Sequence, residues 1–225
     1  MTMLTLKNVS KTYPHSDGDI YALKNIDLTV SQRDFMTITG ASGSGKTTLL
    51  LCMAGLIRPT AGSISFGDMQ IDAASDNELS AYRRKHIGFV MQSFALIPYL
   101  TAIENVMLPL ATTGMTDSKQ VSAAMEVLHL VGLDDRRNHL PRELSAGQQQ
   151  RVAVARALIN EPSMILADEP TGNLDPALSG EIMQLLTSIN EQKGVTIVMV
   201  THSPTASAYG NRHIRLADGV SISAK

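Results

Sequence analysis

The sequence predicts an α/β fold with a mainly parallel sheet and a mostly helical insert between its strands. Three observations support this prediction. Apolar runs at 87–91, 164–167 and 195–200 are typical of strands buried on both faces of a parallel sheet. A glycine-rich turn at 40–47 joins a β-prone stretch to an apolar helix. Residues 93–150 are mostly helical in pattern, so we expect them to interrupt the strand–helix alternation.

The composition limits the classes of function. A chain of 225 residues forms one large domain or two small ones, and 44% hydrophobic residues suffice for a sizeable core. The net charge of −2 lacks the polybasic signature of nucleic-acid binding, and aromatic residues, at 4% without tryptophan, weigh against base stacking. We therefore expect no nucleic-acid partner.

The cysteine usage and the apolar runs indicate the compartment. Cys52, the single cysteine, cannot form an internal disulfide and falls inside an apolar helix, so we expect a buried, inert thiol in a reducing compartment. Residues 1–7 lack the features of a signal peptide, and no apolar run approaches the ~18 residues of a spanning helix. We expect a protein that is soluble alone and works at a membrane only through a partner.

The N-terminal region reads as two strands. Alternation at Leu4–Val9 and Tyr21–Val30 predicts them, with a turn at 13–18. Tyr13, at the end of the first strand, could stack on a nucleotide base or be an ordinary strand-end aromatic. Residues 34–39 alternate and form the β-prone stretch before the glycine-rich turn.

That turn matches G-x-x-x-x-G-K-T, the P-loop pattern. Its residues are Gly40, Ala41, Ser42, Gly43, Ser44, Gly45, Lys46 and Thr47. Glycines allow a close approach to an anion, and the loop N–H groups with the following helix N-terminus would face phosphates. Lys46 adds a positive charge, and Thr47 offers a hydroxyl to Mg²⁺. The alternative is a Gly/Ser-rich surface turn that happens to precede a helix.

The middle of the chain alternates between short strands and helices. We expect a short strand at 63–66, a charged helix at 78–85 and a buried strand at 87–91 that ends at Gln92. The segment 94–100 is apolar but broken by proline. A helix follows at 101–108, and a second runs over 117–131, ending at Gly132. The second helix places three apolar residues on one face: Val121, Met125 and Leu128.

Polar residues with the pattern of a ligand site follow. Ser145 is placed as the N-cap of a helix through 158, which is either an ordinary capped helix or a second anion site. Asp168 and Glu169 end a buried strand, where ligands bind in open α/β sheets, and a magnesium ligand plus a base would explain both. His202 follows the strand at 195–200 and is either a structural hydrogen-bonding group or a member of the same site.

The remaining elements are predicted from caps and periodicity. Asp175 is an N-cap before Pro176, and Gly194 ends the helix that follows. Its expected buried stripe comprises Ile182, Leu185, Leu186 and Ile189. Residues 213–223 read as one or two short strands around Asp218-Gly219.

Five features in this order resemble the ATP-binding cassette (ABC) ATPases over essentially the whole chain. They are the P-loop, Gln92, Leu-Ser-Ala-Gly-Gln at 144–148, the strand ending in Asp168-Glu169, and His202. The resemblance implies a P-loop NTPase (RecA-like) core with a mainly parallel sheet, an N-terminal antiparallel β subdomain and an inserted α-helical subdomain. It implies one ABC ATPase domain over 1–225, in which 1–92 and 151–225 form the β subdomain and core. About 93–150 would be the helical subdomain, with the signature motif.

The resemblance also implies roles in catalysis and metal binding. Lys46 would act at the phosphates, Glu169 would be the general base, and His202 would be the switch histidine at the γ-phosphate. Gln92 would sense Mg²⁺ and the γ-phosphate. Mg²⁺ would be held by Thr47, Gln92 and Asp168.

The nucleotide in the resembling family is ATP, bound between two chains. Ser145, Gly147 and Gln148 would contact ATP held by the other subunit, Asp175 would act across the dimer, and Tyr13 would stack on adenine. The full nucleotide-binding set would be Tyr13, Gly40, Ala41, Ser42, Gly43, Ser44, Gly45, Lys46, Thr47, Thr48, Ser145, Gly147, Gln148 and Asp175.

One position departs from the family pattern. Ala146 stands where Leu-Ser-Gly-Gly-Gln has its first glycine. The extra methyl is harmless if the backbone is ordinary, and costs about 1 kcal/mol or more if φ must be positive.

Finer likeness concerns the partners. Residues 171–175 and 100–106 are similar to the ATPases of lipoprotein-releasing and macrolide-exporting transporters and to the cell-division ATPase paired with an FtsX-type protein. This implies a head-to-tail pair of identical chains with two ATP. It also implies an integral membrane permease of FtsX/MacB type that contacts Phe94 to Leu100. The chain would be peripheral on the cytoplasmic face of the cytoplasmic membrane.

Two other classes remain open. A soluble ABC ATPase scaffold of the iron–sulfur assembly type is weakened because no further cysteine could ligate a cluster. DNA-repair members need a long coiled coil before the signature, and ribosome-acting members usually carry two cassettes. Neither feature is present in this sequence.

Overall fold

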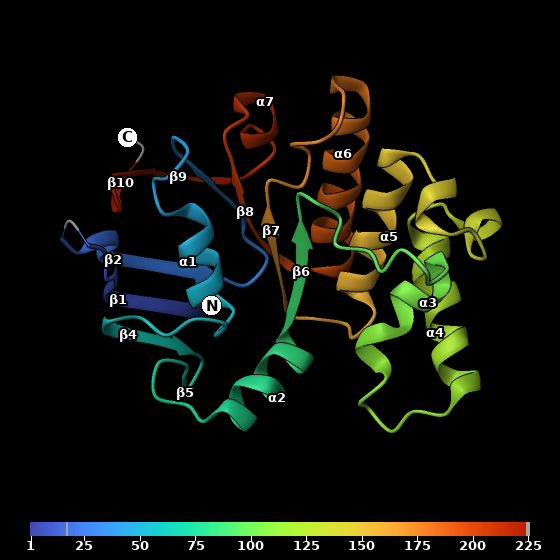
Figure 1. Ribbon diagram of the computed structural model, residues 1–225, viewed down its shortest axis with the longest axis horizontal. Helices are drawn as coiled ribbons and strands as arrows, with labels where there is room; N and C mark the ends of the chain where they lie inside the picture. Colours follow the sequence, from blue (N-terminus) through green and yellow to red (C-terminus); the bar gives the residue numbers. More distant parts are fainter. Residues whose placement is uncertain (17, 224–225) are drawn as a thin grey trace.

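The computed structural model describes residues 1–16 and 18–223, so Asp17, in the turn expected at 13–18, lies outside the described residues. Within this part of the chain the strands form two sheets (Figure 1). The first is antiparallel, in the order β2-β1-β4-β5, and consists of β1 (Thr2–Tyr13), β2 (Ile20–Ser31), β4 (Ala61–Phe66) and β5 (Met69–Gln70). The predicted antiparallel N-terminal portion is confirmed.

The first two strands are longer than the sequence pattern indicates. Asn8 has a positive φ of 50°, and the pairing register of β1 with β2 shifts between Leu6 and Val9. An irregularity of this kind changes which face the side chains take, so the alternation used to recognise the strand is lost beyond it.

The second sheet is mainly parallel and has the order β10-β9-β3-β8-β7-β6. Its members are β3 (Phe35–Thr39), β6 (Ile87–Met91), β7 (Met164–Asp168), β8 (Thr196–Thr201), β9 (Arg212–Ala217) and β10 (Val220–Ser223). β10 alone of these pairs antiparallel, as a hairpin with β9 across Asp218-Gly219. The carboxyl ends of β3, β6, β7 and β8 therefore meet at one edge.

Helices cover both faces of the parallel sheet (Figure 1). They are α1 (Lys46–Met53), α2 (Asp76–His86), α3 (Ala102–Met107), α4 (Asp117–Leu130), α5 (Ala146–Leu158), α6 (Pro176–Lys193) and α7 (Pro204–Ser207), with 3₁₀ turns η1 (Leu108–Leu110), η2 (Asp134–Arg136) and η3 (Pro141–Glu143). None of the described helices is long and apolar enough to cross a bilayer. The region 93–150 is mostly helical, as expected, but its limits as a subdomain stay a prediction.

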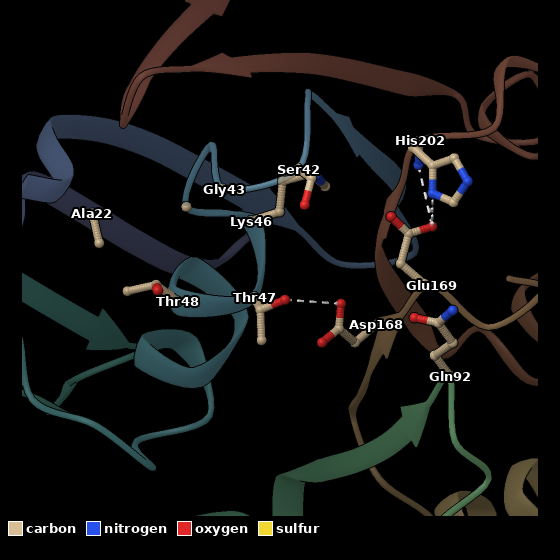
Figure 2. A pocket seen from close by; sticks show the side chains of 11 residues that line it. Ala22, Ser42, Gly43, Lys46, Thr47, Thr48, Gln92, Asp168, Glu169 and His202 are labelled. Atoms are coloured by element: carbon tan, nitrogen blue, oxygen red, sulfur yellow. Dashed lines mark hydrogen bonds and ion pairs between the residues drawn. The ribbon is translucent and has the colours of Figure 1, made fainter.

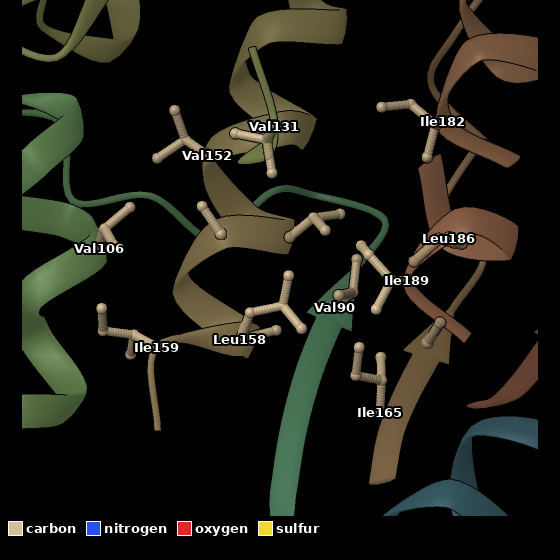
Figure 3. Close-up of a cluster of buried hydrophobic side chains, with 14 of the residues drawn as sticks. Val90, Val106, Val131, Val152, Leu158, Ile159, Ile165, Ile182, Leu186 and Ile189 are labelled. Atoms are coloured by element: carbon tan, nitrogen blue, oxygen red, sulfur yellow. The ribbon is translucent and has the colours of Figure 1, made fainter. Parts of the chain in front are cut away.

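Side chains of β7 alternate between two hydrophobic clusters. Ile165 belongs to the cluster beneath α5 and α6, and Met164 and Leu166 belong to the one beneath α1 and the antiparallel sheet. Figure 3 shows the first cluster, with Ile165 and Val90 facing Leu158. A strand buried on both faces must be apolar at every position, which explains why this strand shows no alternation.

Caps place most helix boundaries where the sequence predicts them, but the predicted apolar face of α4 is only partly correct. Gly132 has a φ of 72° just after α4, as a helix stop requires. Leu128 is buried as predicted, but Val121 and Met125 are 38% and 43% exposed, and Ala124 is the other buried residue of α4. Alanine is only weakly hydrophobic, so the sequence pattern favoured the neighbouring Met125 over Ala124 as the buried residue.

Other burial predictions are confirmed. On α6, Ile182, Leu186 and Ile189 are buried, whereas Leu185 is only partly so. Cys52 is fully buried, and burial raises the pKa of its thiol to about 11. A thiol with so high a pKa is almost wholly protonated at neutral pH and is a weak nucleophile.

Candidate functional site

The carboxyl edge of the parallel sheet holds a cavity of about 640 Å³ (Figure 2). Segments after β3, β6, β7 and β8 contribute to it, and β2 adds one residue. The lining residues are Ala22, Ser42, Gly43, Gly45, Lys46, Thr47, Thr48, Gln92, Asp168, Glu169 and His202. Gly40, Ala41 and Ser44 complete the P-loop without lining the cavity.

Two P-loop glycines are required by the backbone. Gly43 and Gly45 have φ values of 78° and 97°, a left-handed region that side chains disfavour. A Cβ at Gly45 would also overlap the carbonyl oxygen of Ala22 on β2. Gly45 is the N-cap of α1, so the free N–H groups of that helix open into the cavity, as an anion site requires.

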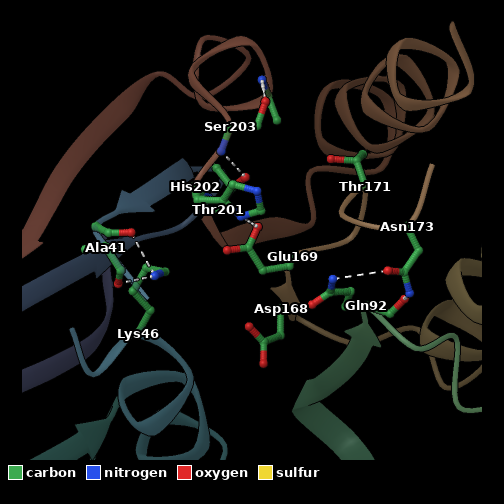
Figure 4. Close-up of polar contacts among 12 residues, drawn as sticks. Ala41, Lys46, Gln92, Asp168, Glu169, Thr171, Asn173, Thr201, His202 and Ser203 are labelled. Carbon is green, nitrogen blue, oxygen red and sulfur yellow. Dashed lines mark hydrogen bonds and ion pairs between the residues drawn. The ribbon is translucent and has the colours of Figure 1, made fainter. Parts of the chain in front are cut away.

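Lys46 is the first residue of α1 and is only 8% exposed. Its Nζ donates to the carbonyl oxygens of Gly40 and Ala41, each at 2.9 Å (Figure 4). The loop therefore holds the ammonium group in a fixed place at the cavity wall.

An oxygen-rich corner faces Lys46. The Thr47 hydroxyl donates to Asp168 Oδ1 over 3.2 Å (Figure 2), and Met91, the residue before Gln92, pairs with Asp168 across β6 and β7. Burial, the largest influence, raises the pKa of Asp168 above its ordinary value. Hydroxyl, carboxylate and amide oxygens are the ligands that Mg²⁺ prefers, and a cation would offset the desolvation of the carboxylate. These residues therefore fit a magnesium ion.

Glu169 has a left-handed backbone, with a φ of 48°, and a side chain that is 14% exposed. Its N–H donates to the carbonyl of Val200 at 3.0 Å, which ties the residue to β8. Its Oε2 accepts from the backbone N–H of His202 at 3.2 Å and lies 3.0 Å from His202 Nδ1 (Figure 4). Strain of this kind costs about 1–3 kcal/mol and concentrates at functional sites. The carboxylate is thus fixed at the cavity, where it could accept a proton from water.

Gln92 is held by a partner that the sequence did not indicate. Its Nε2 donates to Asn173 Oδ1 at 3.2 Å, and Asn173 Nδ2 donates to the Gln92 carbonyl at 2.9 Å (Figure 4). A Cβ on Gly172 would overlap the Gln92 amide. Asn173 follows the Asp168-Glu169 pair in the sequence, but no sequence pattern indicated that β6 and β7 are neighbours in the sheet.

The start of α5 is capped as predicted. Ser145 Oγ accepts the Gln148 N–H at 3.3 Å, and Gln148 Oε1 accepts the Ser145 N–H at 3.0 Å. Gly147 is buried, and a Cβ there would lie 3.0 Å from Leu178 on α6. These signature residues do not line the cavity in one chain.

Asp175 and Tyr13 also lie outside the cavity lining. Asp175 Oδ1 accepts the N–H groups of Ala177 and Leu178 at 2.9 and 3.0 Å, which confirms its place as N-cap of α6. Tyr13 is 39% exposed, with the ammonium of Lys11 at 5.2 Å from its ring centre. Their roles in nucleotide binding stay predictions.

Ala146 has an ordinary backbone. It is the first residue of α5 and is not among the residues with positive φ, so its methyl group causes no strain. We expect Ala146→Gly to lower the free energy of unfolding by no more than about 1 kcal/mol, because glycine is a poor helix former. ATP turnover should rise by no more than about twofold, since the alanine imposes no strain that glycine could relieve. Denaturant unfolding and phosphate release measure the two effects, and a tenfold gain in turnover would contradict this assignment.

Comparison with known proteins gives a consistent family. The family model described as ABC transporter matches residues 23–172. The ABC transporter ATP-binding protein MJ0796 of Methanocaldococcus jannaschii is 48% identical, covering 96% of this chain and 94% of that protein. The lipoprotein-releasing system ATP-binding protein LolD of Geobacter metallireducens is 44% identical, covering 97% of each. The macrolide export protein MacB of Syntrophobacter fumaroxidans is 44% identical over 98% of this chain, but only 31% of that protein is covered.

Solved structures agree with these relatives. A dimeric structure of the MJ0796 cassette superposes with a TM-score of 0.90 at 46% identity, covering 97% of this chain and 96% of that one. A dimeric MJ0796 structure in a post-hydrolysis state, bound to ADP and Pi, also gives 0.90, at 44% identity and 99% coverage of both.

Proposed function

The chain belongs to the ABC ATPase family, and from this premise we propose that it is the ATP-hydrolysing subunit of a membrane complex, working as a pair of identical chains. The observation that carries the proposal is the convergence of Lys46, Asp168, Glu169 and His202 at one cavity on the carboxyl edge of the sheet. Lys46 comes from the P-loop, Asp168 and Glu169 come from the end of β7, and His202 follows β8. Such convergence suits phosphoryl transfer, in which positioning and charge neutralisation supply most of the catalysis.

Each side chain has a task that its geometry suits. Lys46 binds the β- and γ-phosphates, Glu169 accepts a proton from the attacking water, and His202 binds the γ-phosphate from beside Glu169. Thr47, Gln92 and Asp168 would hold Mg²⁺, which would neutralise charge on the phosphate oxygens.

Two chains are needed because the predicted ATP ligands are divided. Ser145, Gly147 and Asp175 do not line the cavity of their own chain. Of the two helix N-termini that can bind anions, those of α1 and α5, only that of α1 therefore opens into this cavity. A second copy, placed head to tail, would bring its Ser145 to the γ-phosphate opposite Lys46. The dimeric structures of MJ0796 support the pairing of two chains. ATP would bridge the chains, and hydrolysis would remove the bridge and shift the population toward open pairs.

The membrane partner is proposed from the segment after Gln92. Tyr99 is 77% exposed, so it is not part of the core. Leu56 and Met91 are 52% and 40% exposed and line a groove of about 330 Å³, whose lining does not include Tyr99. Exposed large apolar residues around one groove favour a protein contact. We propose a permease of the FtsX/MacB type as the occupant, with the chain peripheral on the cytoplasmic face. The names of the LolD and MacB relatives support lipoprotein release or export as the task.

Replacing Tyr99 with aspartate should lower capture of the membrane partner at least ~5-fold. A charge placed at an apolar contact weakens binding by about 1 kcal/mol or more, which corresponds to this factor. ATP affinity should fall less, since Tyr99 does not line the nucleotide cavity. Pull-down from detergent-solubilised membranes and nucleotide titration measure the two effects. Met125→Asp, at an exposed apolar position on α4, is the control.

The same pull-down tests the wider proposal. An integral membrane protein in the eluate supports it, whereas only soluble proteins would favour the scaffold class. Equal loss of partner capture and ATP affinity in Tyr99→Asp would place Tyr99 in a structural role and contradict the docking assignment.

A further inference from the structure

The two residues that follow Ser93 have an unusual backbone. Phe94 and Ala95 have φ values of 59° and 50°, so two consecutive residues with side chains are left-handed. Such residues persist only where surrounding contacts determine them. Figure 1 shows this segment leaving β6 and passing across α5 on its way to α3.

Two backbone hydrogen bonds contribute to this conformation, from the Phe94 N–H to the Met91 carbonyl at 3.2 Å and from the Ala95 N–H to the Ser93 carbonyl at 2.6 Å. The contact from outside the segment comes from Arg156 on α5. Its Nη2 donates to the Phe94 carbonyl at 2.8 Å, and its Nη1 donates to the Ala95 carbonyl. The planar guanidinium offers donors in a fixed fork, which suits two adjacent acceptors, whereas a lysine ammonium is a single point of charge. Arg156 is half-buried, so these bonds are partly shielded from competing water.

The helix that carries Arg156 is itself fixed to the site. Gln150, also on α5, is fully buried, and its Nε2 donates to the carbonyl of Pro170 at 2.6 Å. Pro170 directly follows Glu169. α5 therefore bonds to the segment after β6 through Arg156 and to the segment after β7 through Gln150, and it begins beside Ser145.

We propose that Arg156 is a positioning residue for ATP hydrolysis. By holding Phe94 and Ala95 in the left-handed conformation, it sets where Gln92, two residues earlier, stands relative to Asp168 and Glu169. A shift of α5 would then move Gln92 as well, so the two ends of the site are mechanically linked. The inference rests on the proposed function, because the role of Gln92 at Mg²⁺ and the γ-phosphate comes from there.

The test is Arg156→Lys, which keeps the charge but removes the fork. Turnover of Mg-ATP should fall at least ~10-fold, about 1.4 kcal/mol, because the segment after Gln92 loses its fixed conformation and the bonds to Asn173 alone then position Gln92. KM for ATP should stay within about twofold, because the P-loop contacts are unchanged. Adding Ala95→Gly to this variant should restore turnover to within about threefold of wild type, since glycine adopts the left-handed region without a Cβ penalty.

A second measurement reads the contact without turnover. Amide hydrogen exchange over residues 93–97, measured without added nucleotide, should be faster in Arg156→Lys than in wild type. The control is Arg84→Lys, whose guanidinium donates to the Thr112 carbonyl at 3.1 Å, outside this segment. Thermal unfolding of every variant separates local from global effects.

The outcomes are distinct. Turnover and hydrogen exchange at wild-type levels in Arg156→Lys would overturn the inference. So would a loss of turnover that Ala95→Gly does not restore and that accompanies a lower melting temperature of the Arg156→Lys protein, because the loss would then reflect global destabilisation. A wild-type chain that hydrolyses no ATP with its membrane partner present would refute the proposed function itself. A wild-type chain that hydrolyses ATP and is indifferent to Arg156→Lys would refute the inference alone.

Discussion

Glu169→Gln is expected to lower the rate of ATP hydrolysis at least ~100-fold, about 2.7 kcal/mol in the barrier, while ATP binding and ATP-driven pairing persist. Glutamine has the same shape as glutamate, and its Oε1 can still accept the His202 N–H that Oε2 of Glu169 accepts at 3.2 Å. The left-handed turn at residue 169 is therefore kept. The amide cannot accept a proton from water, so only the chemical step is lost.

Phosphate release measures hydrolysis, and light scattering with Mg-ATP measures pairing. Glu191→Gln, at an exposed carboxylate on α6, is the control. Near-normal turnover in Glu169→Gln would remove Glu169 from the role of base. The two-chain proposal would be contradicted if the wild-type chain hydrolyses ATP but no pairing is detected. The absence of pairing must hold also for Glu169→Gln and with the permease supplied.

Lys46→Ala should act one step earlier, on nucleotide binding. A charge-assisted hydrogen bond contributes about 1.5–3 kcal/mol, so ATP affinity should fall at least ~10-fold. The reason is local. The ammonium is held at the cavity wall by two loop carbonyls, and no other cation lines the cavity among the described residues except His202 when protonated.

Titration with a fluorescent ATP analogue measures this affinity, and Lys85→Ala on the exposed end of α2 is the control. Because the alanine leaves the carbonyls of Gly40 and Ala41 without their partner, thermal unfolding must show that the chain is still folded. A folded Lys46→Ala protein with unaltered ATP affinity would contradict the role of Lys46.

The sequence predicted the features that depend on local chemistry. The P-loop glycines, the caps at Ser145 and Asp175, and the acids that end β7 each follow from neighbouring residues. The fold class and the family are confirmed, and the structure brings Lys46, Gln92, Asp168, Glu169 and His202 to one cavity.

What the sequence could not predict depends on contacts between distant residues or on rare backbone conformations. The bond between Gln92 and Asn173 spans 81 positions, and the bonds of Arg156 to Phe94 and Ala95 span 62 and 61. The register shift around Asn8 and the packing of α4 through Ala124 leave no periodic signal. These contacts can be identified only when the order of the strands in the sheet is known.

Ser145 lies at the start of α5 and does not line the cavity of its own chain, which bears on how the proposed permease would regulate the enzyme. In the proposed pair, turnover per chain depends on how often two chains meet. A permease that anchors two chains side by side would raise their effective concentration to the millimolar range. It would thus activate hydrolysis by proximity alone, before any conformational signal passes between them.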